Sequence, residues 1–139
     1  MELSYQFLSE LPAVAQSLIS FGKNYTIWAF YGEMGIGKTT LIREIVKQFG
    51  STVEVTSPSF SIINEYPLKN ESSIFHFDFY RLHQLTELFE IGFNEYLNQH
   101  NRCLIEWPEI AEPFLSDFQI LKIYMTFLPN EKRLLTLHV

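Results

Sequence analysis

One stretch of the sequence has the residue types and the spacing of a phosphate-binding loop. It reads Gly32-Glu33-Met34-Gly35-Ile36-Gly37-Lys38-Thr39 and fits the pattern G-x-x-x-x-G-K-[ST] without a gap. Glycines at these positions let backbone N–H groups converge on a β-phosphate. Lys38 would bring a positive charge to the β- and γ-phosphates, Thr39 would bind a bridging Mg²⁺ ion, and Thr40 would contact the α-phosphate. The stretch predicts a nucleotide site with Mg²⁺.

Two carboxylates could complete such a site. Asp78 and Glu106 each end an apolar run, Ile-Phe-His-Phe-Asp and Cys-Leu-Ile-Glu respectively. A phosphate-binding loop needs a carboxylate from a neighbouring strand for the magnesium shell, so both residues are candidate metal ligands and catalytic groups, together with Lys38. The alternative for either is a hydrogen-bonded carboxylate that merely ends a strand.

Other polar and aromatic residues near these runs are weaker candidates. Trp107, directly after Glu106, would set its ring at the mouth of the nucleotide site, with plain packing as the alternative. The hydroxyls of residues 57–61 suit a loop that senses a γ-phosphate, although an ordinary Ser/Pro turn fits as well. Because no His, Cys, Asp or Glu set has zinc-site spacing, His76 is expected in the core or supporting the site, and His83 at the surface.

The sequence also favours some nucleotide-binding classes over others. It lacks the N-K-x-D and D-x-x-G elements of a guanine-specific protein, which favours an adenine nucleotide, ATP or ADP, and it lacks an LSGGQ-type signature. Its four arginines, Arg43, Arg81, Arg102 and Arg133, are widely spread rather than gathered in a lid. A small-molecule or nucleoside kinase therefore remains the second reading, after an ATPase.

The pattern of apolar residues predicts the elements that position these groups. Ser9 can cap a first helix that has Pro12 in its first turn and ends at Gly22. A buried strand over 25–31 leads into the glycine loop, and a helix follows it up to Gly50. Strand-like runs follow at 52–56, 60–66, 73–79 and 102–106, with short helices at 85–89 and 95–98.

The tail alternates apolar and polar residues over 118–127, turns at 129–132 and continues from 133 to 139, which predicts a closing hairpin. Together the elements predict an α/β fold. We expect a three-layer α/β/α P-loop NTPase domain, whose mixed sheet is parallel near the glycine loop and antiparallel at an edge. With 139 residues the chain has room for one such domain, 1–139.

Charge and composition limit the kinds of partner that the protein is expected to bind. The formal net charge is −6 and no Lys/Arg run is present, so direct binding to tRNA is disfavoured unless a partner supplies the contact. No secretory signal and no apolar stretch of roughly 18 residues occurs, which predicts a soluble cytoplasmic protein without a membrane anchor. The single cysteine, Cys103, lies in an apolar run and is expected to be a buried, inert thiol.

Several segments together resemble one family, the small bacterial P-loop ATPases of tRNA threonylcarbamoyladenosine biosynthesis known as TsaE (YjeE). The matching stretches are residues 32–40, Ser57-Pro58-Ser59-Phe60 running to Asn64-Glu65-Tyr66, His76-Phe77-Asp78-Phe79-Tyr80-Arg81-Leu82, and Leu104-Ile105-Glu106-Trp107-Pro108-Glu109. They occur in the family's order and spacing over nearly the whole chain. The departures are small, since Glu33, Met34 and Ser59 stand where the family usually has Asp, Leu and Thr.

The resemblance implies ATP hydrolysis linked to a complex with TsaB and TsaD, which modifies tRNA, so that tRNA is reached only through the complex. It places Lys38 and Thr39 on phosphate and Mg²⁺, Glu106 on the metal shell or the attacking water, and Asp78 in a second magnesium or catalytic role. It also implies nucleotide contacts for the loop residues and for Trp107, Ser59, Ser9 and Arg133.

Overall fold

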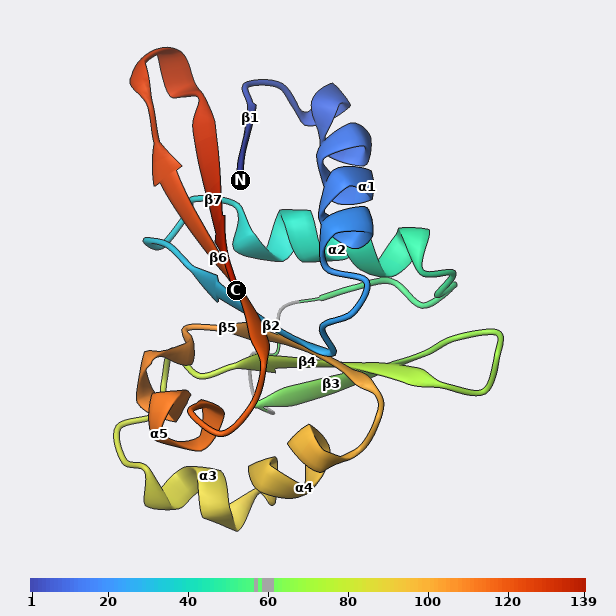
Figure 1. Ribbon diagram of the computed structural model, residues 1–139, viewed down its shortest axis with the longest axis vertical. Coiled ribbons are helices and arrows are strands. Elements are labelled where there is room, and N and C mark those ends of the chain that lie inside the picture. The colour runs from blue at the N-terminus through green and yellow to red at the C-terminus, as the bar shows by residue number, and fades with distance from the viewer. Residues whose placement is uncertain (57, 59–61) are drawn as a thin grey trace.

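The computed structural model describes residues 1–56, 58 and 62–139. Within this part of the chain, seven strands form one mixed sheet (Figure 1). They are β1 (Glu2–Tyr5), β2 (Ile27–Tyr31), β3 (Ile63–Pro67), β4 (Ser73–Asp78), β5 (Arg102–Glu106), β6 (Ile120–Phe127) and β7 (Arg133–His138). Their order across the sheet is β1-β7-β6-β2-β5-β4-β3.

The central strands of the sheet are parallel and both edges are antiparallel. β2 lies between β5 and β6 and runs parallel to both, and β4 runs parallel to β5. All five residues of β2 are buried, as expected for a strand covered on both faces. β3 pairs antiparallel with β4 at one edge, and β7 and β1 continue antiparallel beyond β6 at the other. The predicted mixed sheet and closing hairpin are thus confirmed.

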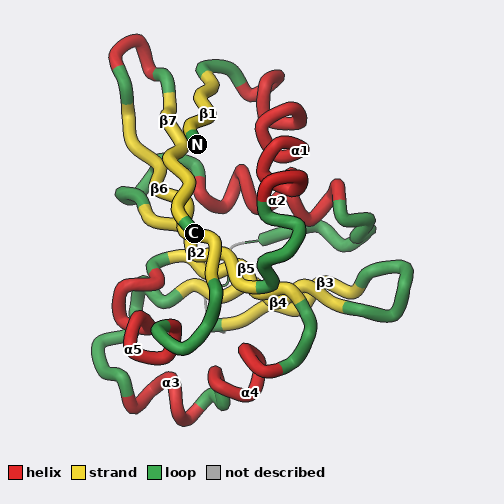
Figure 2. Tube along the Cα trace, in the orientation of Figure 1, coloured by secondary structure: helices red, strands yellow, loops and turns green. Residues whose placement is uncertain are grey.

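Helices cover both faces of the sheet, which confirms the three-layer prediction (Figures 1 and 2). On one face lie α1 (Leu11–Phe21) and α2 (Lys38–Gln48), and on the other lie α3 (Thr86–Glu90), α4 (Phe93–Asn98) and α5 (Glu112–Leu115). Short 3₁₀ turns, η1 (Leu8–Glu10), η2 (Pro108–Ala111) and η3 (Pro129–Glu131), connect some of these elements. Two apolar cores result, one on each face of the sheet.

The helix after the glycine loop forms as its spacing predicts. Leu41, Ile42, Ile45 and Val46 are buried against the sheet and against α1. The helix ends before Gly50, which has a φ of +99° and so adopts the left-handed conformation that glycine favours after a helix end. This packing fixes the start of α2 at the end of β2, where the loop lies.

Two local predictions are wrong, and one strand is absent from the prediction. Ser9 does not cap α1: it lies inside η1, and the Glu10 carboxylate instead accepts hydrogen bonds from the Gln6 and Phe7 backbone N–H groups, at 2.9 and 2.7 Å. Residues 52–56 form no strand, although they are rich in β-branched residues. β1 has no counterpart among the predicted strands, because only Tyr5 in it is buried and its pairing with β7 joins opposite ends of the chain.

Cys103 is buried in β5, as predicted, and burial raises the pKa of its thiol to about 12. A thiol with that pKa stays protonated at neutral pH and is a poor nucleophile. None of the described helices is long and apolar enough to cross a lipid bilayer.

Candidate functional site

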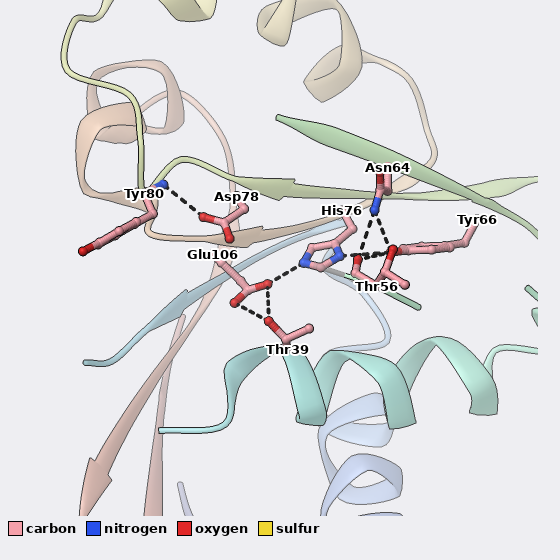
Figure 3. Close-up of polar contacts among 8 residues, drawn as sticks. All are labelled: Thr39, Thr56, Asn64, Tyr66, His76, Asp78, Tyr80 and Glu106. Carbon is pink, nitrogen blue, oxygen red and sulfur yellow. Dashed lines mark hydrogen bonds and ion pairs between the residues drawn. The ribbon is translucent and has the colours of Figure 1, made fainter. Parts of the chain in front are cut away.

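The carboxyl ends of the central strands and the start of α2 enclose a cavity of about 660 Å³. β2 delivers the glycine loop to it, while β4 and β5 end beside it in Asp78 and Glu106. These two residues are paired in the β4–β5 register, so the carboxylates lie next to each other (Figure 3). Because the carboxyl ends of parallel strands lie side by side, polar groups that are distant in sequence come together there.

The glycine loop has a backbone that side chains would disturb. Gly35 and Gly37 have φ angles of +83° and +106°, in the left-handed region that favours glycine. A Cβ at Gly32 would lie 2.9 Å from Ile36 Cγ2 and 3.1 Å from the Met125 carbonyl oxygen. The Ile36 side chain is fully buried and anchors the loop in the core. The loop thus combines a buried anchor with a backbone that only glycine adopts easily.

Lys38 lies folded against its own loop. Its Nζ donates to the carbonyl oxygens of Gly32 and Glu33, the latter at 3.3 Å, and lies 3.9 Å from the centroid of the Trp107 ring. Burial lowers the pKa of the ammonium, while the Glu106 carboxylate opposes that shift. The loop carbonyls and the Trp107 ring are neutral partners, so the positive charge can move to an anion that enters the cavity.

Thr39 contacts the Glu106 carboxylate directly at the start of α2. The Thr39 hydroxyl oxygen is 3.0 Å from both oxygens of the buried Glu106 carboxylate (Figure 3). Asp78 Oδ1 accepts a hydrogen bond of 3.0 Å from the Tyr80 backbone N–H. Hydroxyl and carboxylate oxygens are the ligands that Mg²⁺ prefers. No group of three His, Cys, Asp or Glu residues that could hold a metal occurs among the described residues. The donor set fits an ion that keeps water or phosphate ligands.

A buried polar chain extends from Glu106 away from the cavity. His76 Nε2 is 2.6 Å from Glu106 Oε2, and His76 Nδ1 is 3.3 Å from the Tyr66 hydroxyl. His76 stands two residues before Asp78 in β4, so strand alternation places both on the face that carries α2. The prediction that His76 lies in the core or supports the site is thus confirmed. Asn64 and Tyr66 lie in a stretch that resembles the family, but their contacts depend on the β3–β4 register and could not be predicted from sequence.

The structure brings most of the predicted residues together. Those that line the cavity are Met34, Gly35, Gly37, Lys38, Thr39, Thr40, Asp78, Glu106 and Trp107. Gly32 and Glu33 contribute carbonyl oxygens to Lys38.

Besides Ile36, whose side chain is buried in the core, two predicted nucleotide contacts lie apart from this group. Neither Ser9 nor Arg133 is among the described residues that line the cavity. Arg133 Nε instead donates to the Ile36 carbonyl at 3.2 Å and so contacts the loop from outside. Ser59 lies outside the described residues.

Fold and site together define a P-loop α/β protein, with strand, glycine loop and helix in order and two carboxylates on the neighbouring strands. The family described as Threonylcarbamoyl adenosine biosynthesis protein TsaE matches residues 6–134. The chain belongs to the TsaE family.

Curated relatives and a solved structure agree with this assignment. The protein named tRNA threonylcarbamoyladenosine biosynthesis protein TsaE from Rickettsia conorii is 38% identical over 126 residues, which cover 90% of this chain and 70% of that protein. The protein of the same name from Bacillus subtilis is 33% identical over 105 residues, 74% of this chain and 63% of that protein. The crystal structure of Bacillus subtilis YdiB is similar, with a TM-score of 0.76 and 25% identity, covering 99% of this chain and 83% of YdiB.

Proposed function

We propose that this protein binds ATP with Mg²⁺ and hydrolyses it, and that the hydrolysis supports threonylcarbamoyladenosine modification of tRNA through a TsaB–TsaD complex. The observation that carries the proposal is the contact between Thr39 and the Glu106 carboxylate at the start of α2, beside the glycine loop. The names of the relatives supply the pathway. The absence of guanine-recognition motifs favours adenine.

In this proposal, different residues of the cavity have different roles in the reaction. The loop N–H groups and the positive end of α2 bind phosphate oxygens, and Lys38 turns from the loop carbonyls to the β- and γ-phosphates. Thr39 and Glu106 hold the Mg²⁺ shell, and Asp78 stands beside Glu106 in register to orient the attacking water. Mg²⁺, when bound, neutralises charge that develops on the phosphoryl oxygens. Trp107 offers an aromatic face at the mouth of the cavity.

The partner complex, rather than this chain, would catalyse the transfer of the threonylcarbamoyl group. This chain carries a net charge of −6, which suits docking to basic protein surfaces better than direct contact with tRNA. In this proposal residues 1–139 act as one cytoplasmic ATPase domain, and tRNA is reached only through the complex.

Turnover with and without partners tests the proposal. ATP hydrolysis should be slow for the isolated protein, rise when purified TsaB and TsaD are added, and release phosphate and ADP in equal amounts. Lys38→Ala should lose ATP binding, because the loop then lacks its cation. Phosphate recovered on a metabolite would favour the kinase reading instead. GTP affinity equal to that of ATP would contradict the adenine assignment.

A further inference from the structure

A continuous chain of polar contacts joins four elements behind the cavity. It runs from Thr39 on α2 to Glu106 on β5, then to His76 on β4 and Tyr66 on β3 (Figure 3). The Tyr66 hydroxyl also donates to the Thr56 carbonyl oxygen at 2.9 Å. His76 is 0% exposed, Tyr66 2% and Glu106 3%, so the chain is shielded from water. Buried polar contacts of this kind are stronger than exposed ones.

The direction of the His76–Glu106 hydrogen bond follows from the groups present. An ionised carboxylate only accepts, so His76 Nε2 must donate its N–H to Glu106 Oε2. The Tyr66 hydroxyl has one proton, which it donates to the Thr56 carbonyl oxygen, and its oxygen lies 3.3 Å from His76 Nδ1. Asn64 Nδ2 donates to the same carbonyl at 3.0 Å. No buried side-chain nitrogen or oxygen among the described residues is left without a partner.

Glu106 is therefore held from two sides. Thr39 contacts both of its oxygens, and His76 fixes one of them at 2.6 Å. Without the imidazole N–H, the carboxylate would lose its buried partner and could rotate about its side-chain bonds. Outer partners that orient a ligating carboxylate commonly change metal affinity or activity by 10- to 100-fold when they are removed.

We propose that His76 and Tyr66 are positioning residues for the proposed ATPase site. His76 sets the orientation in which Glu106 meets Thr39, and Tyr66 holds the His76 ring against the backbone at Thr56. The inference rests on the proposed function, because it assigns these residues to a magnesium and phosphate site. It gives the buried polar chain a role beyond packing.

Three substitutions separate positioning from packing. His76→Gln keeps an N–H near the place of Nε2, His76→Leu keeps volume but no donor, and Tyr66→Phe removes only the hydroxyl. Tyr96→Phe is the matched control, because Tyr96 packs on Phe75 and Phe77 on the opposite face of the sheet. Thermal unfolding of every variant checks that it is folded.

Two measurements are made on each folded variant. Calorimetry gives the gain in ATP affinity on adding Mg²⁺, and partner-stimulated turnover gives kcat and KM. We expect His76→Leu to lower both the Mg²⁺-dependent gain and kcat by about 10-fold or more, with Mg²⁺-free affinity unchanged. His76→Gln should recover most of both, Tyr66→Phe should show a smaller loss of the same kind, and Tyr96→Phe should show none.

The outcomes distinguish this inference from the function it rests on. Wild-type protein that neither hydrolyses ATP nor gains affinity with Mg²⁺ would overturn the proposed function and this inference with it. Normal wild-type behaviour together with an unchanged gain and kcat in Tyr66→Phe and His76→Leu would overturn the inference alone. If His76→Leu fails to fold, Tyr66→Phe decides, because it keeps the core filled and removes only the hydroxyl.

Discussion

Glu106 and Asp78 are neighbours in register but have different surroundings. Glu106 is buried and contacts Thr39 and His76, whereas Asp78 lines the cavity and accepts the Tyr80 N–H. The more enclosed carboxylate is the better placed to hold a metal shell, and the more open one can reach a water molecule. The two carboxylates are thus suited to different roles.

Replacing each carboxylate by its isosteric amide tests both roles. Glu106→Gln and Asp78→Asn should retain Mg²⁺-free nucleotide binding, because the glycine loop and Lys38 are untouched. They should lower partner-stimulated ATP turnover by about 10²- to 10³-fold, the cost typical of removing one electrostatic contact to a transition state. Calorimetry measures binding and phosphate release measures turnover. A variant that hydrolyses ATP at the normal rate would show that its carboxylate has no catalytic role.

At the scale of single residues, the sequence predicts those functional side chains that lie in a motif or at the end of a strand. The glycine loop, Asp78 and Glu106 each follow an apolar run directly, so topology alone brings them to one edge of the sheet. Tyr66 carries no such signal. Its contact with His76 depends on β3 pairing with β4, and an antiparallel register is set by the turn and the packing rather than by one residue.

At the scale of the elements, the end of α1 lies close against the sheet. A Cβ at Gly22 would lie 2.7 Å from both Leu121 Cδ2 and Trp28 Cζ2. Gly22→Ala should therefore lower the free energy of unfolding by about 1–3 kcal/mol, since the added methyl group overpacks a dense core. Urea unfolding followed by tryptophan fluorescence measures the change. Ser20→Ala is the control on the exposed side of α1 and should change stability by less than about 0.5 kcal/mol.

A Gly22→Ala variant as stable as the wild type would mean that α1 can shift away from β2 and β6. ATP affinity well below the unfolding transition should stay normal in this variant, because Gly22 precedes β2 whereas the loop follows it.

Elements with strong apolar patterns were predictable, and those that depend on distant pairing were not. β2, β5 and the β6–β7 hairpin are confirmed because their burial follows their own sequence. Residues 52–56 are rich in β-branched residues, but Val53 is exposed and the segment is unpaired in the part of the sheet that is described. β1 forms because β7 offers it an edge. A strand therefore needs a neighbouring strand to pair with as well as residues of high β-propensity.

At the scale of the whole molecule, charge and shape favour a protein partner. The net charge of −6 disfavours direct contact with tRNA, and the cavity mouth presents aromatic and basic side chains outward. Tyr80 is 54% exposed and lies 4.9 Å from Trp107, between ring centroids. Arg81 lines the same mouth. A partner that docks here would contact the site where a nucleotide enters.

Arg81→Ala should weaken partner stimulation more than nucleotide binding. In the proposed site ATP affinity would come mainly from the loop, Lys38 and Thr39, whereas the exposed Arg81 side chain, which also lines the cavity, would meet a carboxylate of the partner. When TsaB–TsaD is titrated, half-maximal stimulation of turnover should need a higher TsaB–TsaD concentration, or the maximal turnover rate should be lower. Calorimetry should show ATP affinity within about 3-fold of wild type. Lys69→Ala is the matched loss of charge, because Lys69 lies in the exposed β3–β4 turn, at the end of the two strands that is remote from the cavity. It should leave partner stimulation and ATP affinity unchanged. An equal loss of ATP affinity and stimulation would place Arg81 on the nucleotide rather than on the partner.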